Sequence, residues 1–304
     1  MIANARMYSV SAEVAALWGR LLSAIIDKAG VPMSVIEHPY PKPMEALWRR
    51  TDLGAVFMCG LPFSRATPQP AIVAAPVPSP PEFGGAARYW SEFVVRADSR
   101  FHTVEDTFGT RIAFSAADSQ SGFVAALTYF MSTGGIAPAA RAAPADTAAP
   151  ADTADIADAA AATHGEPLYR EVTAPTITPL GAVTAVIEAA ADVAPIDAYA
   201  LRLIQRYRPE LTSQVRIVGR TSPTPIPPLV ASGRVAEALR SAFQEAHRDV
   251  ALRGLMDPLL LQRFVLPEAA SYEVLRDGFE SATRYWSQHR FADSMPGAFV
   301  TNRG

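Results

Sequence analysis

The chain has 304 residues, of which 49% are hydrophobic and 19% charged, and a formal net charge of −3. This length can form one large domain or two ordinary ones, and the composition is typical of globular rather than disordered chains. Lys and Arg are scattered, so the basic stripe of a nucleic-acid binder is missing and we exclude nucleic acid as a partner. The single cysteine, Cys59, excludes an intrachain disulfide and a cysteine-rich zinc site.

The N-terminal residues carry no export signal of the usual pattern, which is a basic residue, an apolar run of about 7 to 15 residues and a small-residue cleavage site. Residues 1–8 lead straight into a predicted first strand. The sequence therefore predicts a chain that either is not exported or has lost its signal. No stretch approaches about 20 continuous apolar residues, so no membrane-spanning segment is predicted.

The first third of the chain alternates predicted helices and strands. Apolar residues recur at three- and four-residue steps after Ser11, which predicts an amphipathic helix with Ser11 as N-cap and Gly30 as its end. This order is typical of parallel strands with crossover helices, the α/β class. Strands are predicted over 33–36, 53–59 and 71–75, and a helix over 44–50.

The alternation breaks at a β-rich segment, residues 89–96, and then restarts. The second α/β unit has predicted strands over 111–115, 168–172, 192–196 and 215–218, and predicted helices after Ser121, over 180–190 and over 197–206.

The proline-rich passage 220–228 suits a return crossing between two lobes. An amphipathic helix is predicted beyond it, and the tail to residue 304 is predicted to form helical turns and loops that pack on the first lobe. The sequence thus predicts two α/β lobes joined by two crossings. Residues 1–95 with 221–304 form the first lobe, and residues 96–220 form the second.

Residues 136–163 differ from the rest because they are mostly alanine with interspersed proline. The hexapeptide Ala-Ala-Pro-Ala-Asp-Thr occurs twice, at 142–147 and 148–153. Such a low-complexity segment has few large apolar groups to bury, so we expect a mobile surface loop that folding does not need. A loop that docks a partner is the alternative.

The most informative segment, residues 111–122, is a predicted strand that runs into a polar turn and a helix. Amides at a helix start, together with the hydroxyls of Ser119 and Ser121 and the neighbouring Gln120, can hold an oxyanion without a fixed cation. Gly122 lets backbone and ligand approach closely. The alternative is that Ser119 or Ser121 only caps the helix.

A second candidate position is Asp197, which follows the predicted strand 192–196. Open α/β sheets bind ligands at the carboxyl ends of their strands. Asp197 could therefore accept a hydrogen bond from a ligand, or it could simply cap the next helix. Tyr199 could stack on a ligand or hydrogen-bond to it.

Three further positions lie at or near strand ends in the predicted first lobe: Tyr8, the pair Cys59 and Gly60, and Tyr89 at the first crossing. Cys59 could be a nucleophile only beside a base, and none of the five histidines lies in a motif that suggests one. The histidines also lack the spacing of metal ligands, and no phosphate-binding glycine motif is present. We therefore predict no catalytic residue, no metal and no cofactor.

Five segments, taken in chain order, resemble the phosphonate-type solute-binding components of ABC importers, which have the type 2 periplasmic binding protein fold. The most specific match is Asp-Ser-Gln-Ser-Gly at 118–122, a sequence that this family places at a helix start facing the ligand. The resemblance spans about residues 5 to 275. The other segments are 47–62, 89–96, 186–197 and 220–228.

The resemblance implies a ligand held between two lobes. In the family, the contacts come from an aromatic residue after the first strand, the serine-rich helix start and an aspartate. These correspond here to Tyr8, to Ser119, Gln120 and Ser121, and to Asp197.

Two positions depart from the family pattern. Residues 176–179, Thr-Ile-Thr-Pro, replace the usual Gly-Ser-His, so a ligand contact there is altered or lost. Ala189 replaces a glycine. These departures affect the identity of the ligand more than the fold.

The resemblance implies the receptor of an ABC importer, whose lobes close on a small anionic or zwitterionic ligand such as a phosphonate or a phosphate ester. Its partners would be that small molecule and an ABC permease. The family location is the periplasm, whereas the missing signal favours the cytoplasm. The alternatives are a cytoplasmic enzyme on the same fold, of the menaquinone- or thiamine-pathway type, and a cytoplasmic ligand sensor.

Overall fold

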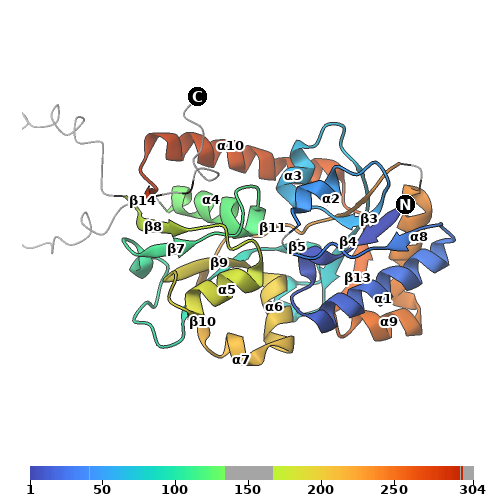
Figure 1. Ribbon diagram of the computed structural model, residues 1–304. Coiled ribbons are helices and arrows are strands. Elements are labelled where there is room, and N and C mark those ends of the chain that lie inside the picture. Colours follow the sequence, from blue (N-terminus) through green and yellow to red (C-terminus); the bar gives the residue numbers. More distant parts are fainter. Residues whose placement is uncertain (41, 134–166, 234, 295, 297–304) are drawn as a thin grey trace, which may run out of the picture.

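The computed structural model describes residues 1–40, 42–133, 167–233, 235–294 and 296. Two sheets with helices packed on them form two lobes, which lie side by side in Figure 1. The predicted α/β class and the two-lobed architecture are confirmed. The expected loop at 136–163 lies outside the described residues.

The first lobe contains a mixed six-stranded sheet. Its core strands form from the apolar runs predicted above, and β3 is buried along its whole length. β1 pairs in parallel with β2 and β3, whereas β12 returns antiparallel between β3 and β4. The order across the sheet is β13 (Leu261–Val265), β4 (Ala71–Pro78), β12 (Leu229–Ala231), β3 (Leu53–Phe57), β1 (Ile2–Asn4) and β2 (Ser34–Val35).

Helix α1 (Ala12–Ala29) shows how the sequence determines the helices of this lobe. The Ser11 hydroxyl accepts the Val14 amide, and the helix ends at Gly30, whose left-handed backbone (φ 63°) suits glycine. The predicted apolar face of α1 is buried in the core. The other helices of this lobe are α2 (Met44–Trp48), α3 (Gly60–Arg65), α8 (Ala236–Glu245) and α9 (Val250–Met256).

The second lobe contains another six-stranded sheet, in which β7 lies parallel to both β8 and β9. Across the sheet the strands are β10 (Val215–Arg220), β6 (Ser91–Arg96), β9 (Val193–Asp197), β7 (Arg111–Ala113), β8 (Tyr169–Thr173) and β14 (Ala292–Ser294). Its helices are the π-turn η4 (Gln120–Val124), α4 (Ala125–Ser132), α5 (Pro179–Ile187), α6 (Ala198–Tyr207) and α7 (Pro209–Thr212). The short helical turns of the chain are η1 (Arg6–Tyr8), η2 (Pro81–Phe83), η3 (Glu105–Thr107), η6 (Ala246–Arg248) and η7 (Ala269–Tyr272).

The two crossings form a small sheet of their own. Strand β5 (Arg88–Tyr89) pairs antiparallel with β11 (Thr224–Pro225), apart from both large sheets. The single strand predicted over 89–96 is therefore two strands, because the chain leaves the hinge at Trp90 and enters the second sheet at Ser91. The chain accordingly joins the second sheet at Ser91, a few residues before residue 96.

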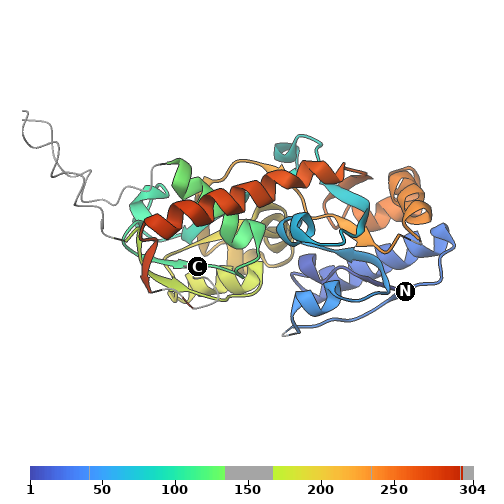
Figure 2. The same cartoon turned by 90° about the horizontal axis from the view of Figure 1, so that it is seen from above.

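A third connection between the lobes was not expected. Helix α10 (Glu273–Gln288) contacts α3 of the first lobe and α4 of the second, and Figure 2 shows it running across both. Leu275 packs in a first-lobe cluster, whereas Trp286 packs in the second lobe and donates its indole N–H to the Leu127 carbonyl at 3.1 Å. Strand β14 then pairs with β8. The tail was predicted to pack on the first lobe, and it packs on the second lobe as well, because periodicity identifies the apolar face of a helix but not its partner.

Candidate functional site

A cavity of about 600 Å³ lies between the lobes and beside the hinge. Residues near the carboxyl ends of β3, β7 and β9 line it, where α/β sheets usually bind ligands. From the first lobe come Arg6, Met7, Lys42, Met44, Glu45, Trp48 and Cys59, from the hinge Tyr89, and from the second lobe Ser115, Ser119, Ser121, Thr178 and Asp197.

The serine-rich turn after β7 has the form expected of an oxyanion site. The Ser119 hydroxyl accepts the Gly122 amide at 3.0 Å, so its own hydrogen remains available for a ligand. Gly122 has to be a glycine, because a Cβ there would lie 1.8 Å from the Ser115 hydroxyl oxygen. Ser121 lines the same wall, and Gln120 is buried behind it.

Thr178 provides a second helix start on the same cavity. Its hydroxyl accepts the Gly181 amide at 2.9 Å and so caps α5, with Pro179 at the first helical position. The family resemblance implies an altered or lost ligand contact in this segment, whereas Thr178 lies on the cavity wall. The Thr-Pro pair identifies the helix start in the sequence, but only the fold brings it beside Ser119.

Asp197 ends β9 and lines the cavity, with only 7% of its surface exposed. One carboxylate oxygen accepts the Ala200 amide at 2.9 Å, and the other lies 3.5 Å from the Tyr8 hydroxyl. Burial raises the pKa of Asp197 to about 7, although these hydrogen bonds act to lower it. The negative charge of Glu92 adds to the rise. Among the described residues no cation forms an ion pair with Asp197. Near neutral pH this group can therefore either accept or donate a hydrogen bond.

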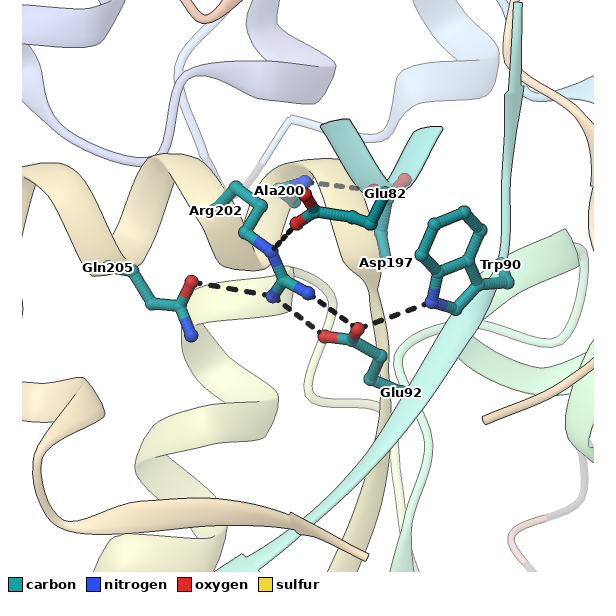
Figure 3. A network of polar contacts seen from close by, with 7 residues as sticks. All are labelled: Glu82, Trp90, Glu92, Asp197, Ala200, Arg202 and Gln205. Carbon is teal, nitrogen blue, oxygen red and sulfur yellow. Dashed lines mark hydrogen bonds and ion pairs between the residues drawn. The ribbon is translucent and has the colours of Figure 1, made fainter. Parts of the chain in front are cut away.

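A polar network lies next to Asp197, behind the hinge (Figure 3). Arg202 on α6 donates to both oxygens of Glu92 on β6, at 2.7 and 2.9 Å, and to Glu82 at 2.6 Å. The Trp90 indole N–H donates to Glu92 at 3.2 Å. Because Glu82 follows β4 of the first sheet and Arg202 belongs to the second lobe, this network ties the lobes together.

Six of the ten predicted site residues line the cavity: Cys59, Tyr89, Ser119, Ser121, Gly122 and Asp197. The buried Tyr89 hydroxyl has no hydrogen bond of normal geometry among the described residues, with Ser121 beside it. Burial also raises the pKa of Tyr89 well above its usual value, so this phenol stays protonated and can donate to a ligand.

The other four predicted residues lie behind the wall. Tyr8 is buried against Phe57 and Tyr199, and Met7 takes the place on the cavity that was expected for Tyr8. The Tyr199 hydroxyl donates to the Leu259 carbonyl at 2.7 Å. The other two are Gly60, which begins α3, and Gln120, which begins η4.

Cys59 contacts the second lobe rather than a base. Its sulfur accepts the Gln120 amide at 3.4 Å. Burial raises the pKa of the Cys59 thiol to about 12, so it is protonated at neutral pH and is no nucleophile. This contact and the one between Tyr8 and Asp197 show the lobes touching across the cavity.

Two lobes, two hinge strands and a cavity lined by helix starts define a solute-binding protein. A family model described as the periplasmic substrate-binding protein of phosphonate ABC transporters matches residues 8–272. The chain therefore belongs to this family, whose members bind substrates for transporters and are not enzymes. No curated protein matches the sequence.

Solved structures share the fold at low sequence identity. A binding protein component of an ABC phosphonate transporter from Pseudomonas aeruginosa is 15% identical with a TM-score of 0.68, over 93% of this chain and 85% of that one. PhnD1 from Prochlorococcus marinus, solved with methylphosphonate, is 15% identical with a TM-score of 0.67, over 94% and 97%. XAC2383 from Xanthomonas citri, solved with ATP, is 16% identical with a TM-score of 0.56, over 94% and 97%. Among the described residues no helix is long and apolar enough to cross a membrane.

Proposed function

We propose that this receptor binds a small oxyanion, such as a phosphonate or a phosphate ester, with the anionic group at the helix starts of Ser119 and Thr178. One observation carries the proposal: two capped helix starts line a single cavity together with the hydroxyls of Ser115 and Ser121. Each start places the positive end of a helix dipole near the ligand. Hydroxyls add oriented donors, and the cations Arg6 and Lys42 line the same cavity from the first lobe.

Ligand release requires the lobes to separate. The Cys59–Gln120 and Tyr8–Asp197 contacts cross the cavity, so both have to break when the lobes open about β5 and β11. We assign delivery to an ABC permease and a periplasmic location to this chain on the strength of its family. Fractionation of cells that express the full-length gene product tests the location.

The binding site is tested by isothermal titration calorimetry with methylphosphonate and a phosphate monoester. Hydrogen bonds to charged groups contribute about 1.5 to 3 kcal/mol. Ser121→Ala and Asp197→Ala should therefore each weaken binding about ten- to a hundredfold. Neither side chain is needed for the caps of η4 and α5, which Ser119 and Thr178 provide. Asp197 caps α6, so circular dichroism melting checks that Asp197→Ala is folded.

Ser132→Ala is the matched control, because Ser132 is exposed at the end of α4, away from the cavity. It should bind like the parent. If both cavity variants also bound as tightly as the parent, the assigned site would be wrong.

A further inference from the structure

The first-lobe wall of the cavity carries an apolar patch made of Met7, Met44 and Trp48. Charged residues, Arg6, Lys42 and Glu45, line the cavity from the same lobe, and Lys42 and Glu45 are exposed to water. The Trp48 indole N–H donates to the Phe57 carbonyl at 2.9 Å, so its one polar atom is already paired within the lobe. Thioethers are weak acceptors and cannot donate. This patch therefore offers a ligand carbon and sulfur surface rather than hydrogen bonds.

The second lobe continues this apolar surface beyond its hydroxyl groups. A ligand anchored at the serine-rich turn would place its remaining atoms between the two apolar walls, where they lose hydrating water. Burying a polar group without a partner is unfavourable, whereas burying carbon is favourable. The apolar residues concerned are Ala116, Ala117, Ile177 and Pro179.

No carboxylate in the cavity is well placed for a ligand ammonium group. Asp197 already accepts the Ala200 amide and lies beside the Tyr8 hydroxyl, and its raised pKa means that much of it is uncharged at neutral pH. Asp118 and Glu45 also line the cavity, but both are exposed to water, and Glu45 forms an ion pair with Arg49. A zwitterion would therefore lose hydration at its cationic end without gaining a buried partner.

The size of the cavity favours a ligand larger than its anchor. A volume of 600 Å³ corresponds to on the order of twenty water molecules. A ligand the size of methylphosphonate would leave most of this space filled with water that contacts apolar side chains. An apolar substituent would fill that space and displace the water.

The geometry points to an oxyanion with an uncharged apolar substituent as the preferred ligand, with Trp48, Met44 and Met7 as the residues that select the substituent. This inference rests on the proposed function, because it takes the anionic group to be at the serine-rich turn. It narrows the ligand class from anions and zwitterions to alkyl- or aryl-substituted oxyanions.

Calorimetry with three phosphonates tests the inference. Each buried methylene should tighten binding about fourfold, which corresponds to about 0.8 kcal/mol. Propylphosphonate has two more methylenes than methylphosphonate and should therefore bind roughly fifteenfold more tightly. 2-Aminoethylphosphonate matches propylphosphonate in heavy atoms but ends in an ammonium group, and it should bind at least tenfold more weakly than propylphosphonate.

Variants assign the preference to the apolar wall. Trp48→Ala should reduce the advantage of propylphosphonate over methylphosphonate to about threefold. Trp48→Phe keeps an aromatic ring and should keep most of the advantage. Met44→Ser provides the same test at a second position, and circular dichroism melting identifies any variant that fails to fold.

The results separate this inference from the proposed function. If neither methylphosphonate nor any other oxyanion binds, the proposed function is wrong. If methylphosphonate binds and 2-aminoethylphosphonate binds as tightly as propylphosphonate, the proposed function stands and the apolar preference is wrong. An unchanged propyl advantage in folded Trp48→Ala and Met44→Ser would also overturn the assignment to this wall.

Discussion

Glu92 and Asp197 are buried carboxylates on neighbouring strands, β6 and β9, with 4% and 7% of their surfaces exposed. Glu92 is held by two hydrogen bonds from Arg202 and one from Trp90. Asp197, at the cavity, has an amide and a distant phenol but no ion-pair partner among the described residues. A buried carboxylate needs a partner, and Arg202 provides one for Glu92 as part of the structure. Asp197 instead has a raised pKa, which is typical of groups at binding sites.

The largest effect is expected from breaking the ion pair between Arg202 and Glu92. Arg202→Met should lower the free energy of unfolding by about 3 kcal/mol, because it leaves Glu92 buried without its cation. Urea denaturation at pH 7 measures the change. The double variant Arg202→Met with Glu92→Gln should regain most of the loss, since it removes the uncompensated charge. A fully stable single variant would mean that Glu92 does not need its partner.

An intermediate effect is expected from Asp197, through the pH dependence of the free energy of unfolding. The folded-state pKa of Asp197, about 7, lies above its usual value of 3.8, so the folded chain keeps a proton that the unfolded chain has lost between these values. The contribution of Asp197 to stability therefore falls as pH rises from about 4 to 7. Asp197→Asn removes this dependence and keeps an oxygen that can accept the Ala200 amide.

The measurement compares urea denaturation of the parent and Asp197→Asn at pH 5 and pH 8. We take the free energy of unfolding of Asp197→Asn minus that of the parent. This difference should be larger at pH 8 than at pH 5 by on the order of 2 kcal/mol. Comparing the two proteins at each pH cancels the contributions of carboxylates that do not interact with Asp197. A stability difference that stays constant with pH would show that Asp197 ionises normally in the folded protein.

The smallest effect is expected from the third partner of Glu92. Trp90→Phe removes the indole donor but leaves both hydrogen bonds from Arg202 and an aromatic ring stacked on Phe83. The free energy of unfolding should fall by about 1 kcal/mol or less. A loss as large as that of Arg202→Met would mean that the Trp90 indole stabilises Glu92 as much as the Arg202 cation does.

Local patterns predict the elements of this fold well but not their partners. The Ser11 cap, the Gly30 stop and the strand runs follow from short-range chemistry, and they lie where the sequence indicates. In contrast, Arg202 and Glu92 are 110 residues apart, and no local pattern links them. The packing of α10 on both lobes has the same origin, since its periodicity fits either lobe.

The candidate site was predictable at the level of segments, while the direction of single side chains was not. The serine-rich turn and Asp197 were found because strand ends and helix starts can be read from the sequence. Residues 6–8 form a helical turn rather than a continuation of the strand, and this turn directs Met7 instead of Tyr8 to the cavity. A Thr-Pro pair is a sequence signal for a helix start, but the place of Thr178 on the same cavity as Ser119 depends on the parallel neighbours β7 and β8.

The strand order also constrains how the chain can fold while the ribosome makes it. The first sheet needs β12 and β13, which are synthesised after five strands of the second sheet, and the second sheet needs β14, the last described strand. Neither sheet can be completed from an N-terminal fragment of the nascent chain. Strands with open edges therefore wait for later partners during translation, and unpaired strand edges promote aggregation. Holdase chaperones are expected to bind the emerging chain until α10 and β14 have been made.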